Sequence, residues 1–295
     1  LTRYSMLYTE MIHCDAILHN SQIDNLLQFD PIQHPITLQL GGSNPINLAQ
    51  ASKIAVEQYN YDEINLNCGC PSPRVTCGSF GACLMKEPEL VIECIKAMEQ
   101  SVNVPITIKC RLGVDDLDSY EFLHDFIKKI SESTKTTHFI IHARKAYLKG
   151  LNPKEYRTVP PLNYDSVFKL CKDFPSLKFT INGGIKSIDK INEFLSTNEL
   201  NGCMIGRLAY ENIWTLSTID KEIYKAERNN YSKKEVLQIY GKYLDKVKLL
   251  NPKVSMSKLV KPLVSLFLGS KGSSQYRQLL SDSKFLILSK NFAIF

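Results

Sequence analysis

Apolar residues recur along the chain in two alternating patterns, short runs typical of strands and longer stretches with helical spacing. The short runs predict seven strands, over Met6–Met11, Pro35–Leu40, Glu63–Asn67, Pro105–Arg111, His138–His142, Lys178–Asn182 and Gly202–Ile205. The stretches between them predict helices over Asn47–Tyr59, Pro88–Gln100, Tyr120–Ser131, Tyr164–Lys172 and Ser187–Thr197. Strands that alternate with helices indicate parallel βα units.

The length of the repeating unit favours an α/β fold of the TIM (β/α)8 barrel type over an open sheet. A barrel of this type closes with eight strands, and the pattern supplies seven. The chain also begins abruptly and without Met. We therefore expect that residues 1–213 form strands two to eight and that the first barrel strand lay upstream.

From Trp214 onward the pattern predicts helices only, over Lys233–Leu250, Ser257–Leu268 and Gln275–Leu280. We expect a small all-helical domain over residues 214–295. This segment holds 15 Lys and Arg against 6 Asp and Glu, a net charge of +9, whereas residues 1–213 hold 21 against 24, a net charge of −3. Clustered cations attract phosphates, so a polyanionic partner is expected, although a solvated helical face would give the same composition.

Composition limits the class of protein. The 295 residues are 44% hydrophobic and 22% charged, which is usual for a globular chain and excludes a disordered one. Membrane helices need about 20 apolar residues, and the sequence has no such run, so no membrane partner is expected. Nine scattered cysteines, an odd number, suggest reduced thiols in an intracellular protein.

Polar residues and glycines stand at the ends of the predicted strands, where parallel α/β proteins bind ligands. They are Gln39, Asn67, Cys70, Lys109, His142, Asn182, Gly183, Gly184, Gly206 and Arg207. The last two turns are typical of a phosphate site, because loops after strands seven and eight present backbone N–H groups to an anion. A lysine on an apolar strand is costly unless it meets a charge, so Lys109 predicts an anionic ligand.

Cys70 stands on a tight turn between Gly69 and Pro71, just past a strand. The turn is typical of a functional cysteine, although a small residue at a turn is the plain alternative. Cys68, Cys77 and Cys83 lie nearby, but their spacing matches neither the usual zinc pairs nor a common iron–sulfur pattern. We therefore expect no metal.

Together these motifs identify a family. The segments that carry the resemblance are Tyr8-Thr9-Glu10-Met11, Gln39-Leu40-Gly41-Gly42, Asn65-Leu66-Asn67-Cys68-Gly69-Cys70-Pro71-Ser72, Phe80-Gly81-Ala82-Cys83-Leu84-Met85, His142-Ala143-Arg144-Lys145-Ala146 and Ile181-Asn182-Gly183-Gly184. Over nearly the whole chain the sequence resembles the tRNA-dihydrouridine synthases, most closely their A branch. The resemblance implies an FMN enzyme that reduces uridines 20 and 20a in the D-loop of tRNA, with NADPH as reductant.

The resemblance also implies roles for residues. Cys70 would be the general acid, giving a proton to C5 of uracil while hydride reaches C6. Flavin contacts are implied for Gln39, Lys109 and His142, and phosphate contacts for Asn182, Gly183, Gly184, Gly206 and Arg207. Substrate tRNA would be contacted by Asn67, Arg144, Lys145, Lys154, Arg157 and Arg277.

Two features depart from the family pattern. The family's first strand carries an Ala-Pro-Met segment that packs on the flavin, and the sequence lacks it. Ser274 stands where the family has Arg. Two alternatives therefore stay open, a catalytically silent tRNA-binding protein and an FMN oxidoreductase acting on a free pyrimidine. We expect a monomer, in the cytoplasm or in an organelle with its own tRNAs.

Overall fold

A computed structural model of the chain describes residues 1–149, 151, 155, 158–227 and 231–281. Contacts divide it into two compact units. One comprises Met6–Ile185 and Lys190–Met204, and the other comprises Leu1–Ser5, Lys186–Asp189 and Ile205–Phe295. The domain boundary at residue 213 stays a prediction.

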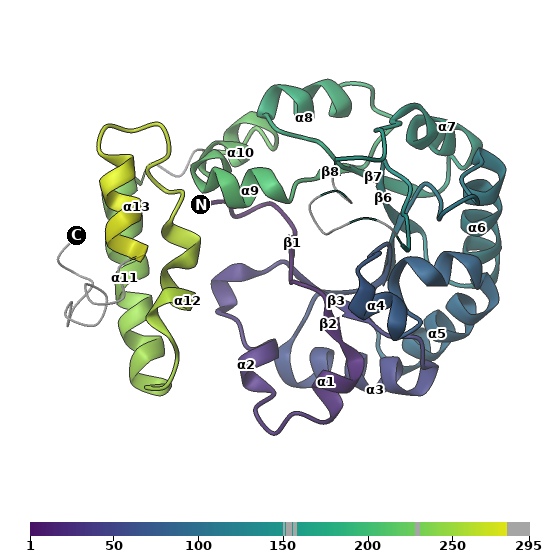
Figure 1. Cartoon of the computed structure of the whole chain (residues 1–295), viewed down its shortest axis with the longest axis horizontal. Coiled ribbons are helices and arrows are strands. Elements are labelled where there is room, and N and C mark those ends of the chain that lie inside the picture. Colours follow the sequence, from purple (N-terminus) through teal and green to yellow (C-terminus); the bar gives the residue numbers. More distant parts are fainter. Residues whose placement is uncertain (150, 152–154, 156–157, 228–230, 282–295) are drawn as a thin grey trace. The chain divides into compact units, whose positions relative to one another are not determined.

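The first unit is built on one parallel sheet (Figure 1). Its strands are β1 (Leu7–Tyr8), β2 (Ile12–His13), β3 (Ile36–Gly41), β4 (Glu63–Cys68), β5 (Ile106–Arg111), β6 (His138–His142), β7 (Lys178–Asn182) and β8 (Gly202–Met204). Both β1 and β2 pair with β3, and the sheet continues in chain order to β8. Over the described residues the sheet thus has seven strand positions, and no ladder joins β8 to β1. The predicted succession of parallel βα units of the TIM-barrel class is confirmed.

Helices connect the strands. They are α1 (Cys14–Leu18), α2 (Asp24–Leu27), η1 (Pro31–Gln33), α3 (Pro45–Tyr59), α4 (Pro73–Cys77), η2 (Gly81–Lys86), α5 (Pro88–Ser101), α6 (Tyr120–Ser133), α7 (Asp165–Asp173) and α8 (Ile188–Leu195). The outer ring around the sheet contains α3, α5, α6, α7 and α8 (Figure 1). Each strand from β3 to β6 is buried over most of its length, whereas on β7 Phe179 and Ile181 are buried. On β4 the apolar residues Ile64, Leu66 and Cys68 are fully buried and alternate with polar ones.

Two predicted elements differ from the structure. Only Leu7–Tyr8 of the predicted strand Met6–Met11 is a strand, β1, and a second short strand, β2, follows at Ile12–His13; the two pair with different parts of β3. The predicted helix Ser257–Leu268 is broken into α12 (Met256–Val260) and η5 (Lys261–Leu263). Pro262 explains the break, because proline lacks the N–H that an α-helix needs in its interior.

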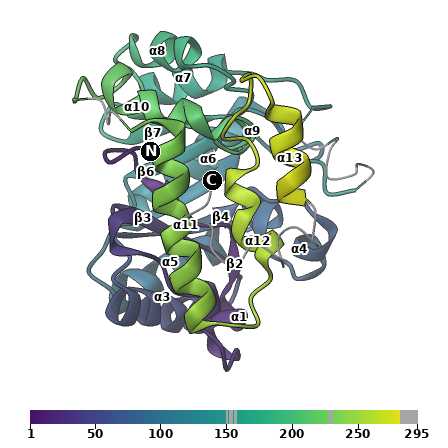
Figure 2. The same ribbon diagram turned by 90° about the vertical axis from the view of Figure 1, so that its left-hand side faces the viewer.

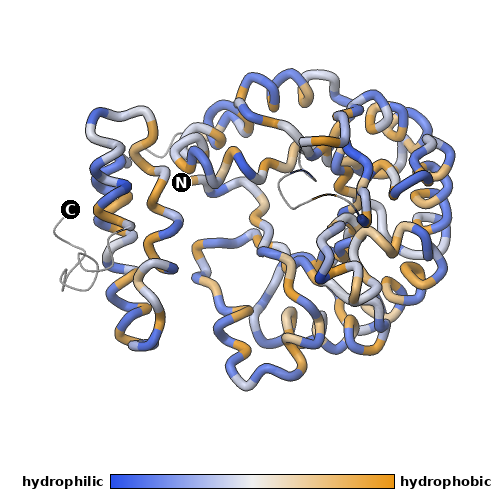
Figure 3. The backbone as a smooth tube through the Cα atoms, in the orientation of Figure 1, coloured by the Kyte–Doolittle hydropathy of each residue, from blue (hydrophilic) through white to orange (hydrophobic). Residues whose placement is uncertain are grey.

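The second unit is helical (Figure 2). Besides α12 and η5 it contains α9 (Arg207–Glu211), η4 (Ile213–Thr215), α10 (Leu216–Glu222), α11 (Lys233–Leu250) and α13 (Ser273–Ser281). Its own core comprises Leu237, Leu244, Val260, Leu263, Leu266 and Leu280. Apolar positions recur along α11 among hydrophilic ones (Figure 3). Across the described part of the chain, no helix is both long and apolar enough to cross a membrane.

Candidate functional site

The strand ends of β3, β4 and β5 bring three predicted site residues together. Asn67 on β4 is the register partner of Lys109 on β5. On the other side, Asn67 Nδ2 donates to Gln39 Oε1 of β3 over 2.8 Å. Neighbouring parallel strands place register partners on the same face of a sheet, so these side chains share one face at the carboxyl ends of their strands.

Cys70 follows Asn67 on a turn that the surrounding backbone holds closely. Asn67 Oδ1 accepts from the backbone N–H groups of Gly69 and Cys70, over 3.1 and 2.9 Å. The carbonyl oxygen of Cys70 accepts from Ala82 N over 2.9 Å. Gly81 has φ +69°, and a Cβ there would lie 2.6 Å from the Cys70 oxygen. Glycine at position 81 is therefore needed for the close approach.

The two cysteines of this segment lie in different surroundings. Cys68 is fully buried, and that burial raises the pKa of its thiol well above the usual value. Cys70 is partly exposed, with its Sγ 3.5 Å from Ser72 Oγ. Of the two, only Cys70 can reach a ligand.

Lys109 is an ammonium for which the described residues supply no anionic partner. Among the described residues, no hydrogen bond or ion pair reaches its Nζ, and β5 is otherwise buried. Burial, together with the neighbouring Arg111 charge, lowers the pKa of Lys109 to about 8. Arg111 itself donates to the carbonyl oxygens of Gly69 and Lys145, over 2.7 and 3.1 Å. A partly buried cation of this kind is stabilised by an anionic ligand.

The turn after β7 lies beside the end of β6. His142 is the register partner of Asn182, whose Nδ2 donates to Met204 O over 2.8 Å. Gly183 and Gly184 have φ +112° and +68°, and Tyr164 OH donates to Gly183 O over 2.6 Å. A Cβ at Gly183 would lie 2.7 Å from His142 Cδ2. Leu162 packs against both glycines as well, so this turn has no room for a side chain and requires glycine at both positions.

Gly206 and Arg207 belong to the helical unit. Both are exposed, and Arg207 is the first residue of α9. Space around Gly206 is open, since a Cβ there would meet nothing within 4 Å. Their joint phosphate site with Gly183 and Gly184 stays a prediction.

The residues predicted to contact tRNA differ in their burial and in their partners within the protein. Arg144 is buried, and its Nη1 donates to the carbonyl oxygens of Thr158 and Pro160. Lys145 pairs with Asp118 over 2.6 Å, which is the main reason why its pKa is raised. Arg277 is exposed on α13, as is Ser274. Lys154 and Arg157 lie outside the described residues. A contact with RNA stays a prediction for all of them.

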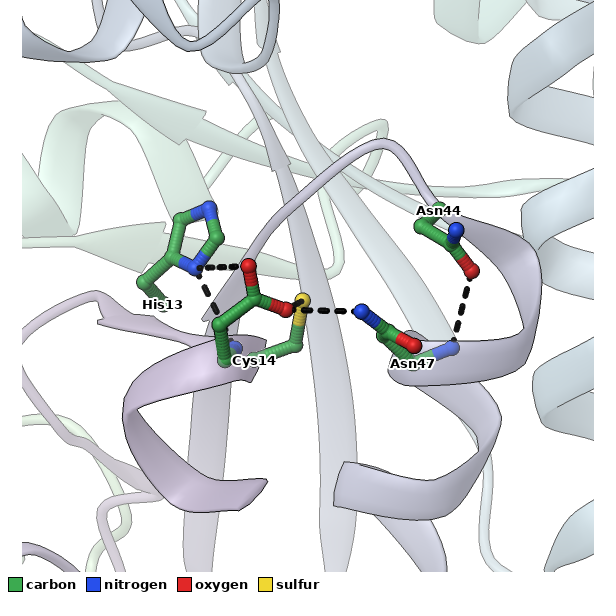
Figure 4. Close-up of polar contacts among 5 residues, drawn as sticks. His13, Cys14, Asn44 and Asn47 are labelled. Carbon is green, nitrogen blue, oxygen red and sulfur yellow. Dashed lines mark hydrogen bonds and ion pairs between the residues drawn. The ribbon is translucent and has the colours of Figure 1, made fainter. Parts of the chain in front are cut away.

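A polar cluster near the start of the chain has ligating atoms but an internal explanation (Figure 4). One ligand atom each from His13, Cys14 and Asp15 lies within 4.8 Å of the others. However, His13 Nδ1 accepts from Asp15 N as the cap of α1, and Asn47 donates to Asp15 over 2.8 Å. Burial, followed by the Asp15 charge, raises the pKa of Cys14 to about 12. The cluster therefore joins α1 to α3 as a hydrogen-bonded unit.

Sequence reasoning missed the polar residues inside the sheet. Glu63, Asn65 and Thr107 are buried and hydrogen-bonded to one another, below the predicted site residues. Their alternation with apolar residues was visible in the sequence. In a barrel whose outer face is covered by helices, such alternation requires that the polar set points inward, and this could have identified them.

Comparison with known proteins decides the family. The family described as "Dihydrouridine synthase (Dus)" matches residues 1–292. The chain belongs to the dihydrouridine synthase family. Its relatives in this family include the "tRNA-dihydrouridine(20/20a) synthase" of Salmonella typhi, 44% identical over 96% of this chain and 83% of the relative. Proteins of the same name from Vibrio vulnificus and Synechocystis are 43% and 44% identical, over 96% and 97% of this chain and 85% and 84% of the relatives.

Family membership confirms the predicted family and the enzyme class. The dihydrouridine synthases are flavin-dependent oxidoreductases. The residues of the β3–β5 strand ends fit such a cofactor, because they include the Lys109 ammonium, which has no anionic partner in the part of the chain that the structure describes.

Proposed function

We propose that the chain reduces uridines 20 and 20a in the D-loop of tRNA to 5,6-dihydrouridine, using FMN as cofactor and NADPH as reductant. The observation that carries the proposal is the Lys109 ammonium, which has no described anionic partner and stands in register with Asn67 beside the Cys70 turn. Relatives that are named for this activity at these positions support it.

The cofactor would be held by residues at the ends of four strands and in the helical unit. Gln39, Lys109 and His142 would contact the flavin ring, and its phosphate would meet Asn182, Gly183, Gly184, Gly206 and Arg207. When bound, FMN supplies the hydride that reduces the C5–C6 double bond of uracil. With a pKa of about 8, Lys109 is mostly protonated at neutral pH and would favour a negatively charged ligand.

Cys70 would complete the reduction by giving a proton to C5 of the uracil. Free thiols are mostly protonated at neutral pH, so a cysteine can act as a general acid there. Asn67 holds the backbone N–H groups of Gly69 and Cys70, and this restricts where the thiol can lie. The Asn67 side chain would also contact the uracil base or its ribose.

The target base must leave its stack to reach such a site. Backbone phosphates would be held meanwhile by cations of the helical unit and of the loop between residues 144 and 157. The helical segment has a net charge of +9, and Lys242 and Lys246 are exposed one turn apart on α11. Recognition would rest mainly on tRNA shape and phosphates. We place the protein, as a monomer, in the cytoplasm or in an organelle with its own tRNAs.

The test is reduction of an unmodified tRNA transcript by the purified chain with FMN and NADPH. Mass spectrometry of the digested tRNA is expected to locate dihydrouridine at positions 20 and 20a, with no conversion of free uridine or uracil. Conversion of the free pyrimidine would favour that alternative instead. Tight tRNA binding without any product from flavin-loaded protein would favour the catalytically silent one.

A further inference from the structure

One face of β4 is polar along its whole length although the strand is buried on both faces. Glu63, Asn65 and Asn67 are 6%, 0% and 7% exposed. Their register partners on β3 include Thr37 for Glu63 and Gln39 for Asn65. Buried polar groups are costly unless they are hydrogen-bonded, so the partners of this face need to be accounted for.

From the Cys70 turn the hydrogen bonds lead inward. Asn67 Oδ1 accepts from the N–H groups of Gly69 and Cys70. Asn67 Nδ2 donates to Gln39 Oε1 over 2.8 Å, and Gln39 Nε2 donates to Asn65 Oδ1 over 2.8 Å. The Gln39 amide on β3 is thus hydrogen-bonded to two amides of β4, those of Asn67 and Asn65.

The same series continues to the amino end of the strand. Asn65 Nδ2 donates to Thr107 Oγ1 over 2.9 Å, and Thr107 Oγ1 donates to Glu63 Oε1 over 2.8 Å. Glu63 Oε1 also accepts from Tyr8 OH over 3.0 Å and from Thr37 Oγ1 over 3.2 Å. Glu63 lines a cavity of about 480 Å³, together with the first residues of β5, β6 and β7. The series therefore spans the strand from its amino end to the Cys70 turn. We call its members the interior chain, and they are Glu63, Thr107, Asn65, Gln39 and Asn67.

The direction of the interior chain is fixed at both ends. At the Cys70 end two backbone N–H groups can only donate, so Asn67 must present its oxygen to them. Its amide nitrogen then faces Gln39, and the same requirement orients Gln39 and Asn65 in turn. At the other end Glu63 Oε1 accepts three hydroxyl donors, among them Thr107. Both ends demand the same orientation of every amide between them.

This arrangement orients side chains and does not carry protons. An amide group has fixed donors and acceptors in its ordinary form, so Asn65 and Gln39 cannot relay a proton. Turning either amide over would break two buried hydrogen bonds at once, and each unsatisfied buried group costs about 1–3 kcal/mol. The amides of Gln39 and Asn67 are consequently held in one orientation before any ligand arrives.

We propose that Glu63, Thr107 and Asn65 are positioning residues, which act through Gln39 and Asn67 to fix the Cys70 turn. Their contribution to catalysis rests on the function proposed above, whereas their effect on the turn does not. Thr107 is the link to break, because its hydroxyl both accepts from Asn65 and donates to Glu63. Thr37 is the matched control, because it is equally buried and donates to the same oxygen without linking it to Asn65.

The experiment compares Thr107→Val, Thr107→Ser and Thr37→Val in the full chain. The first readout needs no flavin or tRNA and is the rate at which iodoacetamide alkylates Cys70 relative to the exposed Cys77. Tryptic cleavage after Arg74 separates the two, and fragmentation distinguishes Cys70 from the buried Cys68. We expect Thr107→Val to change the relative rate at least about fivefold, with the other two variants within about twofold of wild type.

The second readout is dihydrouridine formation by flavin-loaded protein. We expect Thr107→Val to lower kcat about tenfold or more with the KM for tRNA nearly unchanged, since small misplacements of catalytic groups are costly. Thr107→Ser is expected to restore it. Where Thr107→Val does not fold, Thr107→Ala is compared with Thr37→Ala. Equal Cys70 alkylation in the Thr107 and Thr37 variants would overturn the proposal. Altered alkylation in a chain that forms no dihydrouridine would instead overturn the proposed function and leave the positioning role standing.

Discussion

The side-chain oxygen of Asn67 accepts a hydrogen bond from the backbone N–H of Cys70 over 2.9 Å. A residue at the end of β4 thereby fixes the turn that carries the candidate general acid. The same oxygen accepts from Gly69 N, so one amide satisfies two donors of the turn.

Replacing Asn67 tests that relationship directly. Asn67→Ala leaves two N–H groups without their acceptor, and we expect a loss of about 1–3 kcal/mol in the free energy of unfolding together with a large fall in dihydrouridine formation. Asn67→Asp keeps the acceptor for the turn but loses the donor to Gln39. The rate of Cys70 alkylation in Asn67→Asp should therefore lie closer to that of wild type than the rate in Asn67→Ala. Equal alkylation in both variants would contradict the account.

Lys109 makes the stability of the flavin-free protein depend on pH. Its pKa is about 8 in the folded chain and returns to about 10.4 on unfolding. Between these values the unfolded state binds more protons, so the stability contribution of this group rises as the pH rises through that window. We expect Lys109→Met to be more stable than wild type at pH 7 by about 1–3 kcal/mol, with the difference shrinking toward pH 10.4. Urea unfolding at several pH values checks this, and a difference that does not change with pH would contradict it.

Lys109→Met should also weaken FMN binding. The variant removes the ammonium that we assign to an anionic cofactor, so its affinity for FMN should be lower than that of wild type. The affinity of wild type should decrease above about pH 8, where Lys109 loses its proton, and the variant should not show this decrease. Flavin fluorescence titration measures both effects. Lys86→Met serves as a control, because that lysine already pairs with Asp115 over 3.0 Å.

The Gly184 turn should reject any side chain. At φ +68°, a Cβ would lie 2.5 Å from Leu162 Cδ1. We expect Gly184→Ala to destabilise the protein by about 1–3 kcal/mol. Gly206→Ala is a matched control for stability alone, because a Cβ there meets nothing within 4 Å. Thermal unfolding compares the two, and equal melting temperatures would show that the turn is not constrained as described.

Arg277 should contribute to tRNA affinity through phosphate contact. We expect Arg277→Ala to weaken tRNA binding and to reduce the slope of log K against log salt by about 1. Lys53→Ala is the control, since that residue lies on α3 near Glu57. The slopes come from filter binding over a range of salt concentrations. A slope unchanged by Arg277→Ala would remove Arg277 from the interface.

Much of the fold follows from hydrophobic periodicity. The strands His138–His142 and Lys178–Asn182 and the helix Lys233–Leu250 have the predicted bounds, because each is a buried or amphipathic segment with clear ends. The short helices α1, α2 and α4 were not predicted, since four or five residues give no period to read. The helix predicted across Pro262 was wrong, because apolar residues continue at helical spacing past a proline that has no N–H to donate within the helix.

The candidate site was predictable at the strand ends and not between them. The sequence places Gln39, Asn67 and Lys109 at the same edge because parallel strands end together. It does not reveal which buried polar groups pair, since pairing depends on register between strands far apart in sequence, as for Asn65 and Thr107. The burial of Arg144 was likewise invisible, because a basic loop gives no sign of which arginine turns inward.

The central claim is that Cys70 is the proton donor in reduction of tRNA uridine. Single-turnover formation of dihydrouridine by pre-reduced, FMN-loaded Cys70→Ala, beside wild type and Cys77→Ala, tests it most directly. Cys77 is exposed on the neighbouring α4 and is the matched control. We predict a fall of about 100-fold or more for Cys70→Ala, with a normal rate for Cys77→Ala. A normal rate for Cys70→Ala would contradict the account.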